Sequence, residues 1–132
     1  MRRLGGAVLA VLMALGATPA FATGEIACEG DGVSVDMLVG RLEVLAILRV
    51  VVRIGDKTWS SDQSYAEGTP IQVGQRFEDD RMLLVDFTDD NVEGVIARLR
   101  AFSLTEGDNY VSGGAFSMKG EGAYLVDCSL RG

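Results

Sequence analysis

The stretch from Leu42 to Ile54 restricts the fold more than any other part of this chain. Every even-numbered residue in it is apolar, and its charged residues, among them Arg49 and Arg53, all fall on odd positions. A period of two is that of a half-buried β-strand, whereas a helix would gather its charges on one side at a spacing of 3.6. Because thirteen residues exceed the usual length of a strand, we expect a bend or bulge within the segment.

Turn signals on both sides of this stretch indicate antiparallel pairing. Gly55-Asp56 forms a two-residue loop of the kind that closes a hairpin, and Lys57-Thr58-Trp59 follows it. Ahead of the stretch, Val39-Gly40 is expected to reverse the chain. Further short strands are expected at Ile26–Glu29, Val33–Leu38, Ile71–Phe77, Met82–Phe87, Ala115–Met118 and Ala123–Ser129.

Residues 91–104 fit two structures. Asp89-Asp90-Asn91 could cap a helix in which the apolar side chains from Val92 to Leu99 share one face. As a strand, the same segment would point alternate residues from Val95 to Ala101 inwards and leave its two arginines outside. The strands expected on either side favour the strand.

Cys28 and Cys128 are the only cysteines, and they lie near the two ends of the expected domain. In an oxidising compartment such a pair forms a disulfide, and only one connectivity exists. A redox-active pair would instead call for a Cys-x-x-Cys spacing, which is absent. The sequence therefore predicts an all-β fold, a small antiparallel barrel or sandwich of about eight strands, with the disulfide joining its N- and C-terminal strands.

The first 22 residues have the pattern of a signal peptide. Arg2 and Arg3 precede an apolar run from Leu4 to Leu15, which is too short to span a bilayer as a stable anchor. Ala20-Phe21-Ala22 supplies the small residues that signal peptidase reads, so we place cleavage after Ala22. The alternatives are an uncleaved anchor, a buried N-terminal helix or a lipoprotein. We therefore expect residues 1–22 to be removed and residues 23–132 to form a single periplasmic or secreted β-domain, with no stable membrane insertion after cleavage.

The charge of the expected mature chain limits its partners. Without the two arginines of the signal, ten basic residues remain against 19 acidic ones, a net charge of −9. Such a charge repels nucleic acid phosphates and anionic lipids, and it favours a cationic envelope protein as partner. The plainer interpretation is that the charge serves solubility.

The residues that most enzymes need are missing. There is no histidine, and a disulfide would occupy both cysteines, which removes the common nucleophile systems and the usual zinc ligands. Acidic clusters at residues 78–80 and 86–93 lie in or beside expected turns, and they lack the alternation of a calcium-binding loop. We expect no enzymatic activity, cofactor or metal. Trp59, Tyr65 and Tyr110 could line a ligand site, although core or rim positions are commoner for aromatic residues in a small β-domain.

One C-terminal stretch resembles a known family. Residues 112–125 begin with a serine–glycine run, and Phe116, Lys119, Gly120, Ala123 and Leu125 match an aromatic-x-x-Lys-Gly-x-x-Ala-x-Leu pattern. This stretch is similar to part of the periplasmic inhibitors of C-type lysozyme, although the two motifs lie closer together here. The resemblance implies a disulfide-bridged β-barrel in which Ser112 and Lys119 bind the partner.

Three functions follow from these observations. The first is a non-enzymatic envelope domain that binds a protein or cell-wall partner through loops or an exposed strand edge. The second is an inhibitor of a cationic wall-degrading enzyme such as lysozyme. The third is a small barrel that binds an apolar ligand against the even-numbered face of Leu42–Ile54, unless that face simply fills the core.

Overall fold

The chain folds into ten β-strands, and no helix occurs among the residues that the structure describes. The structure is a computed structural model that describes residues 22–41 and 43–131, so the expected signal peptide lies outside the described residues apart from Ala22. The strands are β1 (Ala22–Gly30), β2 (Val33–Arg41), β3 (Leu45–Ile54), β4 (Lys57–Ser60), β5 (Thr69–Pro70), β6 (Gln72–Glu78), β7 (Met82–Thr88), β8 (Val95–Glu106), β9 (Asn109–Met118) and β10 (Gly122–Arg131).

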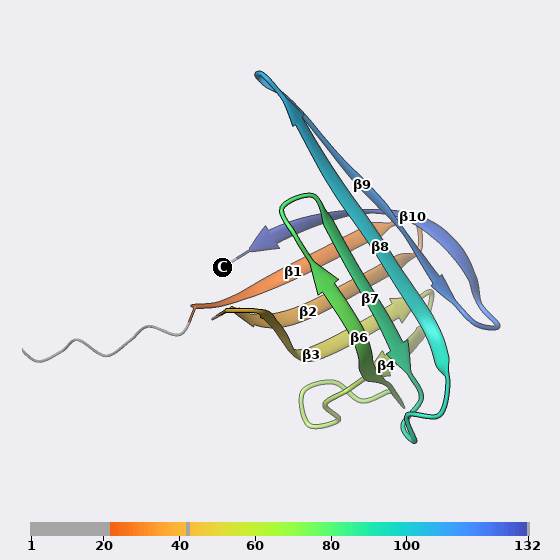
Figure 1. The fold of residues 1–132 in the computed structure, drawn as a ribbon. Helices are drawn as coiled ribbons and strands as arrows, with labels where there is room; N and C mark the ends of the chain where they lie inside the picture. Colours follow the sequence, from red (N-terminus) through yellow and green to blue (C-terminus); the bar gives the residue numbers. More distant parts are fainter. Residues whose placement is uncertain (1–21, 42, 132) are drawn as a thin grey trace, which may run out of the picture.

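All ten strands belong to one sheet, in the order β5-β4-β3-β2-β1-β10-β9-β8-β7-β6. The first and last long strands, β1 and β10, pair in its middle, where Cys28 lies directly opposite Cys128 and forms a disulfide with it. The sheet curls into a nearly closed barrel (Figure 1). This confirms the expected all-β class and the disulfide between the terminal strands, although the strands number ten rather than eight.

A single segment closes the barrel between its two edge strands. Thr69 and Pro70 pair with β4, the fully buried Ile71 follows, and β6 then pairs with β7. β3 and β6 do not pair through their backbones. A side-chain hydrogen bond connects them instead, in which Nε of Arg76 donates to the carbonyl oxygen of Leu45 at 2.7 Å.

The long alternating stretch forms β3, and a bulge divides it as expected. Leu38 of β2 pairs with Arg49 but Val39 pairs with Ile47, so Leu48 has no opposite residue. Because one extra residue reverses which side chains face inwards, Leu45 is buried before the bulge and Val50 is buried after it. The prediction of one continuous even-numbered inner face was therefore wrong: Leu48 is half exposed.

The strand boundaries differ from expectation most at two places. The first is β9, which begins at Asn109 rather than at Ala115, and the second is the turn expected at Val39-Gly40. Val39-Gly40 does not reverse the chain, because β2 runs on to Arg41 and Gly40 pairs with both Thr23 and Ala46. Residues 91–104 fitted either a helix or a strand, and the strand is confirmed. Residues 95–106 form β8, which pairs with both β7 and β9.

Side chains fill the barrel interior. Phe87 of β7 and Phe116 of β9 are both fully buried and meet edge to face, with ring centroids 6.2 Å apart. Met37 and Leu99 are equally buried beside them in the same apolar cluster. In the described part of the chain no helix is long and apolar enough to cross a membrane.

Candidate binding site at the barrel mouth

The hairpin of β8 and β9 projects beyond the rest of the barrel (Figure 1). On one side β7 pairs with β8 only as far as Met82 opposite Phe102, and on the other side β10 pairs with β9 only as far as Val126 opposite Gly114. Beyond these pairs the two strands continue alone to a two-residue turn at Gly107-Asp108. The glycine has a φ of +60°, which the turn requires and which other residues rarely adopt. The hairpin therefore presents both faces and both edges to its surroundings.

The outer face of this hairpin carries exposed apolar side chains. Phe102, Leu104 and Val111 are 48%, 55% and 57% exposed, and Leu104 lies directly opposite Val111. Phe102 covers the cross-strand Gly113, where an added Cβ would lie only 3.3 Å from its ring.

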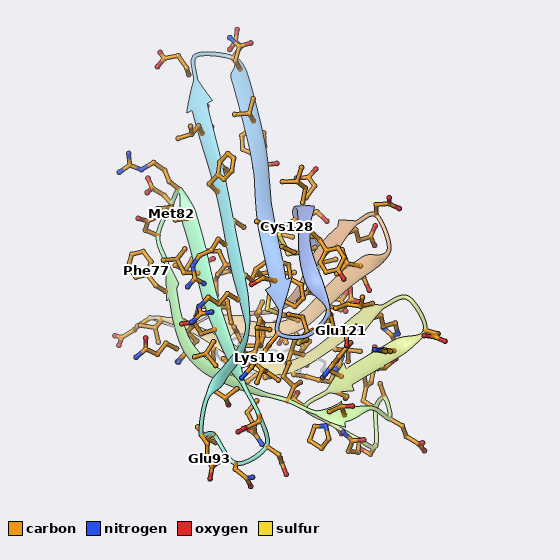
Figure 2. The ribbon with its side chains drawn as sticks, turned by 90° about the vertical axis from the view of Figure 1, so that its right-hand side faces the viewer. Phe77, Met82, Glu93, Lys119, Glu121 and Cys128 are labelled. Atoms are coloured by element: carbon orange, nitrogen blue, oxygen red, sulfur yellow. A yellow bond between two sulfur atoms is a disulfide. The ribbon has the colours of Figure 1, made fainter. Side chains whose placement is uncertain are left out.

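The exposed apolar surface continues from the hairpin onto the barrel wall. Met82 of β7 is opposite Phe102, and Phe77 of β6 follows across Leu84. Figure 2 shows Phe77 and Met82 on the same side of the molecule. The apolar stripe is the set Phe77, Met82, Phe102, Leu104 and Val111, each at least 43% exposed. Its extent over four neighbouring strands distinguishes it from scattered surface residues, and such a patch is typical of an interaction site.

The barrel mouth opens at the base of the hairpin. A cavity of about 250 Å³ lies there, with Ile26, Leu83 and Ala101 among the buried residues of its lining. The ion pair between Arg41 and Glu78 also lines it, with Nε and Oε1 3.2 Å apart. The full lining is Ile26, Arg41, Glu78, Asp79, Asp80, Arg81, Met82, Leu83, Ala101, Phe102, Ser103, Tyr110, Ser112, Gly113, Cys128, Ser129 and Leu130.

One wall of the mouth is interrupted where β9 leaves β10. We call this gap, between residues 110–113 of β9 and residues 127–130 of β10, the notch. Residues from both of its sides line the cavity. The hydroxyl of Ser112 crosses it and donates to Oδ1 of Asp127 at 3.0 Å.

Acidic side chains predominate around the mouth and the hairpin tip. Arg41 is already paired with Glu78, and its hydrogen bond to that carboxylate raises the pKa of Arg41. Arg81 is the other cation in the lining, and its Nε lies 3.8 Å from Asp80. The acidic residues of the lining, the notch and the tip are Glu78, Asp79, Asp80, Glu106, Asp108 and Asp127. The site therefore suits a partner that combines apolar with basic groups.

The carboxylate of Asp79 holds the turn between β6 and β7, which lies on the rim of the barrel mouth. Oδ1 of Asp79 accepts hydrogen bonds from the backbone N–H groups of Arg81 at 2.8 Å and Met82 at 2.7 Å. These bonds, that of Arg81 first, hold the pKa of Asp79 below its ordinary value. The turn thus starts β7 at the place where the apolar stripe crosses it.

The depressed pKa of Asp79 predicts how the rim turn responds to acid. The ionised carboxylate of Asp79 stabilises the folded turn, and this stabilisation is fully present above about 3.9, the ordinary pKa of Asp in an unfolded chain. It is lost as the pH falls through the lower pKa that Asp79 has in the folded protein. In an NMR titration from about pH 6 to about pH 2, we expect the amide signals of Arg81 and Met82 to move together, with a midpoint below about 3.9. Asp79→Asn should abolish this transition, and a midpoint at or above the ordinary value would contradict the assignment.

The two residues proposed from the family resemblance lie apart. Ser112 lines the mouth, whereas Lys119 lies in the β9–β10 turn at the opposite end, where its N–H donates to the carbonyl of Ile96 at 2.7 Å. Seven residues of extended strand separate them by roughly 23 Å. Figure 2 shows Lys119 below Cys128, farther from the projecting hairpin.

The aromatic residues considered as ligand-site residues are equally dispersed. Tyr110 lines the mouth, but Trp59 belongs to the core cluster, and Tyr65 lies under the guanidinium of Arg49 at 3.5 Å. Sequence reasoning missed the apolar stripe. The alternation of Phe102 and Leu104 before the Gly107-Asp108 turn was the available signal.

No metal-binding group is apparent in the described part of the chain, since it holds no cluster of three or more histidine, cysteine or acidic side chains that could hold an ion. Comparison with protein-family models, curated proteins and solved structures gave no match. The fold and the site thus define a meandering β-barrel with a projecting hairpin and an acidic, partly apolar mouth.

Proposed function

We propose that this protein is an exported, non-enzymatic binding domain that holds a cationic protein partner at its barrel mouth and projecting hairpin. The observation that carries the proposal is the apolar stripe, whose five side chains remain exposed next to an acidic rim. Burial of large apolar side chains supplies most of the affinity of protein interfaces, and charges around them guide the partner and select it.

Export rests on two features. The disulfide between Cys28 and Cys128 indicates an oxidising compartment, because the cytosol keeps most thiols reduced. The pattern of residues 1–22 supplies the route, with a basic start, an apolar run and small residues before the cleavage point. Together they support a periplasmic or secreted domain.

A narrower form of the proposal is the inhibition of a cationic wall-degrading enzyme such as lysozyme. Ser112 supports it, because this residue of the resembling stretch lies at the mouth beside Asp127. Lys119 lies at the far end of the barrel, so an enzyme seated on the mouth would be held by Ser112 and the stripe rather than by both residues. Binding of an apolar ligand has less support, since core side chains fill the interior and the mouth cavity of about 250 Å³ lies below the usual range of ligand pockets.

Binding to immobilised C-type lysozyme tests this proposal. We expect the wild-type protein to bind, and the double variant Phe102→Ser, Leu104→Ser to bind at least tenfold more weakly, because two exposed anchors of the stripe are lost. Val92→Ser is the matched control: it removes an apolar side chain that is 62% exposed in the loop between β7 and β8, at the opposite end of the barrel. This control should stay within about twofold of the wild type.

The same measurement on a panel of other basic proteins separates the general proposal from the narrow one. Retention of one of them, with the same loss in the stripe variant, would support a cationic partner other than lysozyme. Equal binding by the wild type and the stripe variant would place the site elsewhere. Binding of no basic protein at physiological salt would overturn the proposal.

A further inference from the structure

The notch exposes the backbone edges of two strands that lie on either side of it. The ladder between β9 and β10 ends at Gly114 opposite Val126, and neither strand has a ladder partner on this side beyond that pair in the described part of the chain. Unpaired strand edges are templates for a further strand. Whether the notch can accept one depends on which backbone groups point into it.

On β10 the disulfide fixes this direction. The Cα atoms of Cys28 and Cys128 are 3.9 Å apart, as expected for an antiparallel pair that does not exchange backbone hydrogen bonds. Their neighbours Asp127 and Ser129 therefore bond to β1. By alternation, the N–H and C=O groups of Cys128 and Leu130 point away from β1 and into the notch.

On β9 the hairpin turn fixes the direction. A two-residue loop closes on a hydrogen-bonded pair, here Glu106 and Asn109, so the next pair, Thr105 and Tyr110, is not bonded within the hairpin. The pattern holds at Ser103, which donates its N–H away from β9 to the carbonyl of Arg81 at 2.8 Å. Its cross-strand partner Ser112 accordingly points its backbone groups towards β10, as does Tyr110.

The side chains beside these edges differ on the two faces of the sheet. On the inner face, Leu130 lies opposite the buried Ile26 and lines the mouth. On the outer face, Asp127 is exposed, and its Oδ1 accepts a hydrogen bond from the hydroxyl of Ser112. An extended segment with alternating apolar and basic residues would match both faces.

We propose that an extended segment of the partner protein enters the notch and pairs as a β-strand with the edge of β10, through the backbone of Cys128 and Leu130. Entry of the segment opens the hydrogen bond that Ser112 makes across the notch to Asp127. The apolar side chains of the segment then enter the mouth, and a basic side chain replaces the Ser112 hydroxyl at Asp127. Tyr110 and Ser112 offer the second edge on the other side of the segment. This inference rests on the proposed function, because it specifies how the same site holds its partner.

A short synthetic peptide that alternates valine and lysine, with both ends blocked, is the probe. With the isotope-labelled, disulfide-bonded protein, we expect the amide signals of Cys128 and Leu130 to shift on titration and their hydrogen exchange to slow at least tenfold. Methylation of the peptide nitrogens on one edge should weaken binding at least tenfold, whereas methylation of the other edge should have a smaller effect. Replacement of lysine by glutamate should also weaken binding.

A proline variant tests the β10 edge from the protein side. Leu130→Pro removes an N–H that faces the notch without removing a bond to β1, and Leu130→Ala is its matched control, since it shortens the same side chain and keeps the N–H. We expect at least a tenfold loss for proline and less than a threefold loss for alanine. Equal losses would show that only the side chain matters and would overturn strand pairing.

The outcomes distinguish this inference from the proposed function. If the stripe variants change lysozyme or basic-protein binding but the peptide shifts no amide between residues 126 and 131, strand pairing fails and the binding site stands. If both methylated peptides bind as well as the parent, strand pairing also fails. If the protein alone associates with rising concentration and protects the amides of Cys128 and Leu130, a second copy occupies the notch and the proposal is wrong.

Discussion

Replacement of both Cys28 and Cys128 by serine is expected to lower the melting temperature by roughly 10–20 °C. The disulfide closes a loop with a sequence separation of 100 residues, and loss of a native disulfide in a small domain costs about 2–5 kcal/mol of the free energy of unfolding. Because native domains are stable by only about 5–15 kcal/mol, this is a large share. Differential scanning calorimetry of the two proteins provides the measurement.

The matched control for this experiment is the pair of alanine substitutions at the same positions. Cys28 is fully buried, so a serine hydroxyl there adds a desolvation cost that alanine does not. A decrease in melting temperature that both double variants share is caused by the loss of the disulfide. Any further decrease in the serine variant is caused by burial of the hydroxyl. An unchanged melting temperature in the alanine protein would show that the bridge contributes nothing to stability.

The same variants connect stability to the site. Cys128 lies in the lining of the mouth and on the edge of β10 that we propose for strand pairing. Without the bridge, the end of β10 is held to β1 by its ladder alone. We therefore expect partner binding to weaken in the disulfide variants even below the temperature at which they unfold.

The sequence predicted the class of fold because local patterns and the fold agree along most of this chain. The two-residue loop at Gly55-Asp56 lies where the turn residues indicated. The β9–β10 turn lies between the expected strands Ala115–Met118 and Ala123–Ser129. The strands on either side of residues 91–104 favoured a strand there, and β8 does form, although it begins only at Val95. Ala97, Leu99 and Ala101 are buried, as the alternation of a strand requires. A helix would have required a different set of buried residues.

The sequence failed where the outcome depended on pairing between distant segments. Alternation within residues 42–54 could not locate the bulge at Leu48, because a bulge is set by the register against β2. The glycine of Val39-Gly40 predicts a turn, yet Gly40 lies between two paired strands.

The site was hidden from the sequence for a related reason. Phe102, Leu104 and Val111 have the composition of core residues, and only the early end of the flanking ladders leaves them exposed. The family resemblance pointed to Ser112 and Lys119 together, since they lie seven positions apart. In an extended strand this spacing takes them to opposite ends of the barrel. Of the two residues, only Ser112 lies in the candidate site. The apolar stripe next to it was not predicted from the sequence and is seen only in the structure.

Phe116→Ala is expected to lower the free energy of unfolding by about 3–5 kcal/mol, as is usual when a buried aromatic side chain is truncated. Phe116 is fully buried, and its ring contacts that of Phe87 edge to face. It also lies on β9 two residues from Gly114, the last residue that pairs with β10, so it anchors the root of the projecting hairpin inside the barrel. Urea denaturation of the purified variant measures the loss.

A double-mutant cycle with Phe87→Ala separates the ring contact from burial. We expect each single variant to lose about 3–5 kcal/mol and the pair to lose less than the sum by about 0.5–1.5 kcal/mol, the coupling of an edge-to-face pair. Additive losses would mean that the two rings only fill space. A measurable coupling would show that the ring contact itself stabilises the packing below the part of β9 that carries Tyr110 and Ser112.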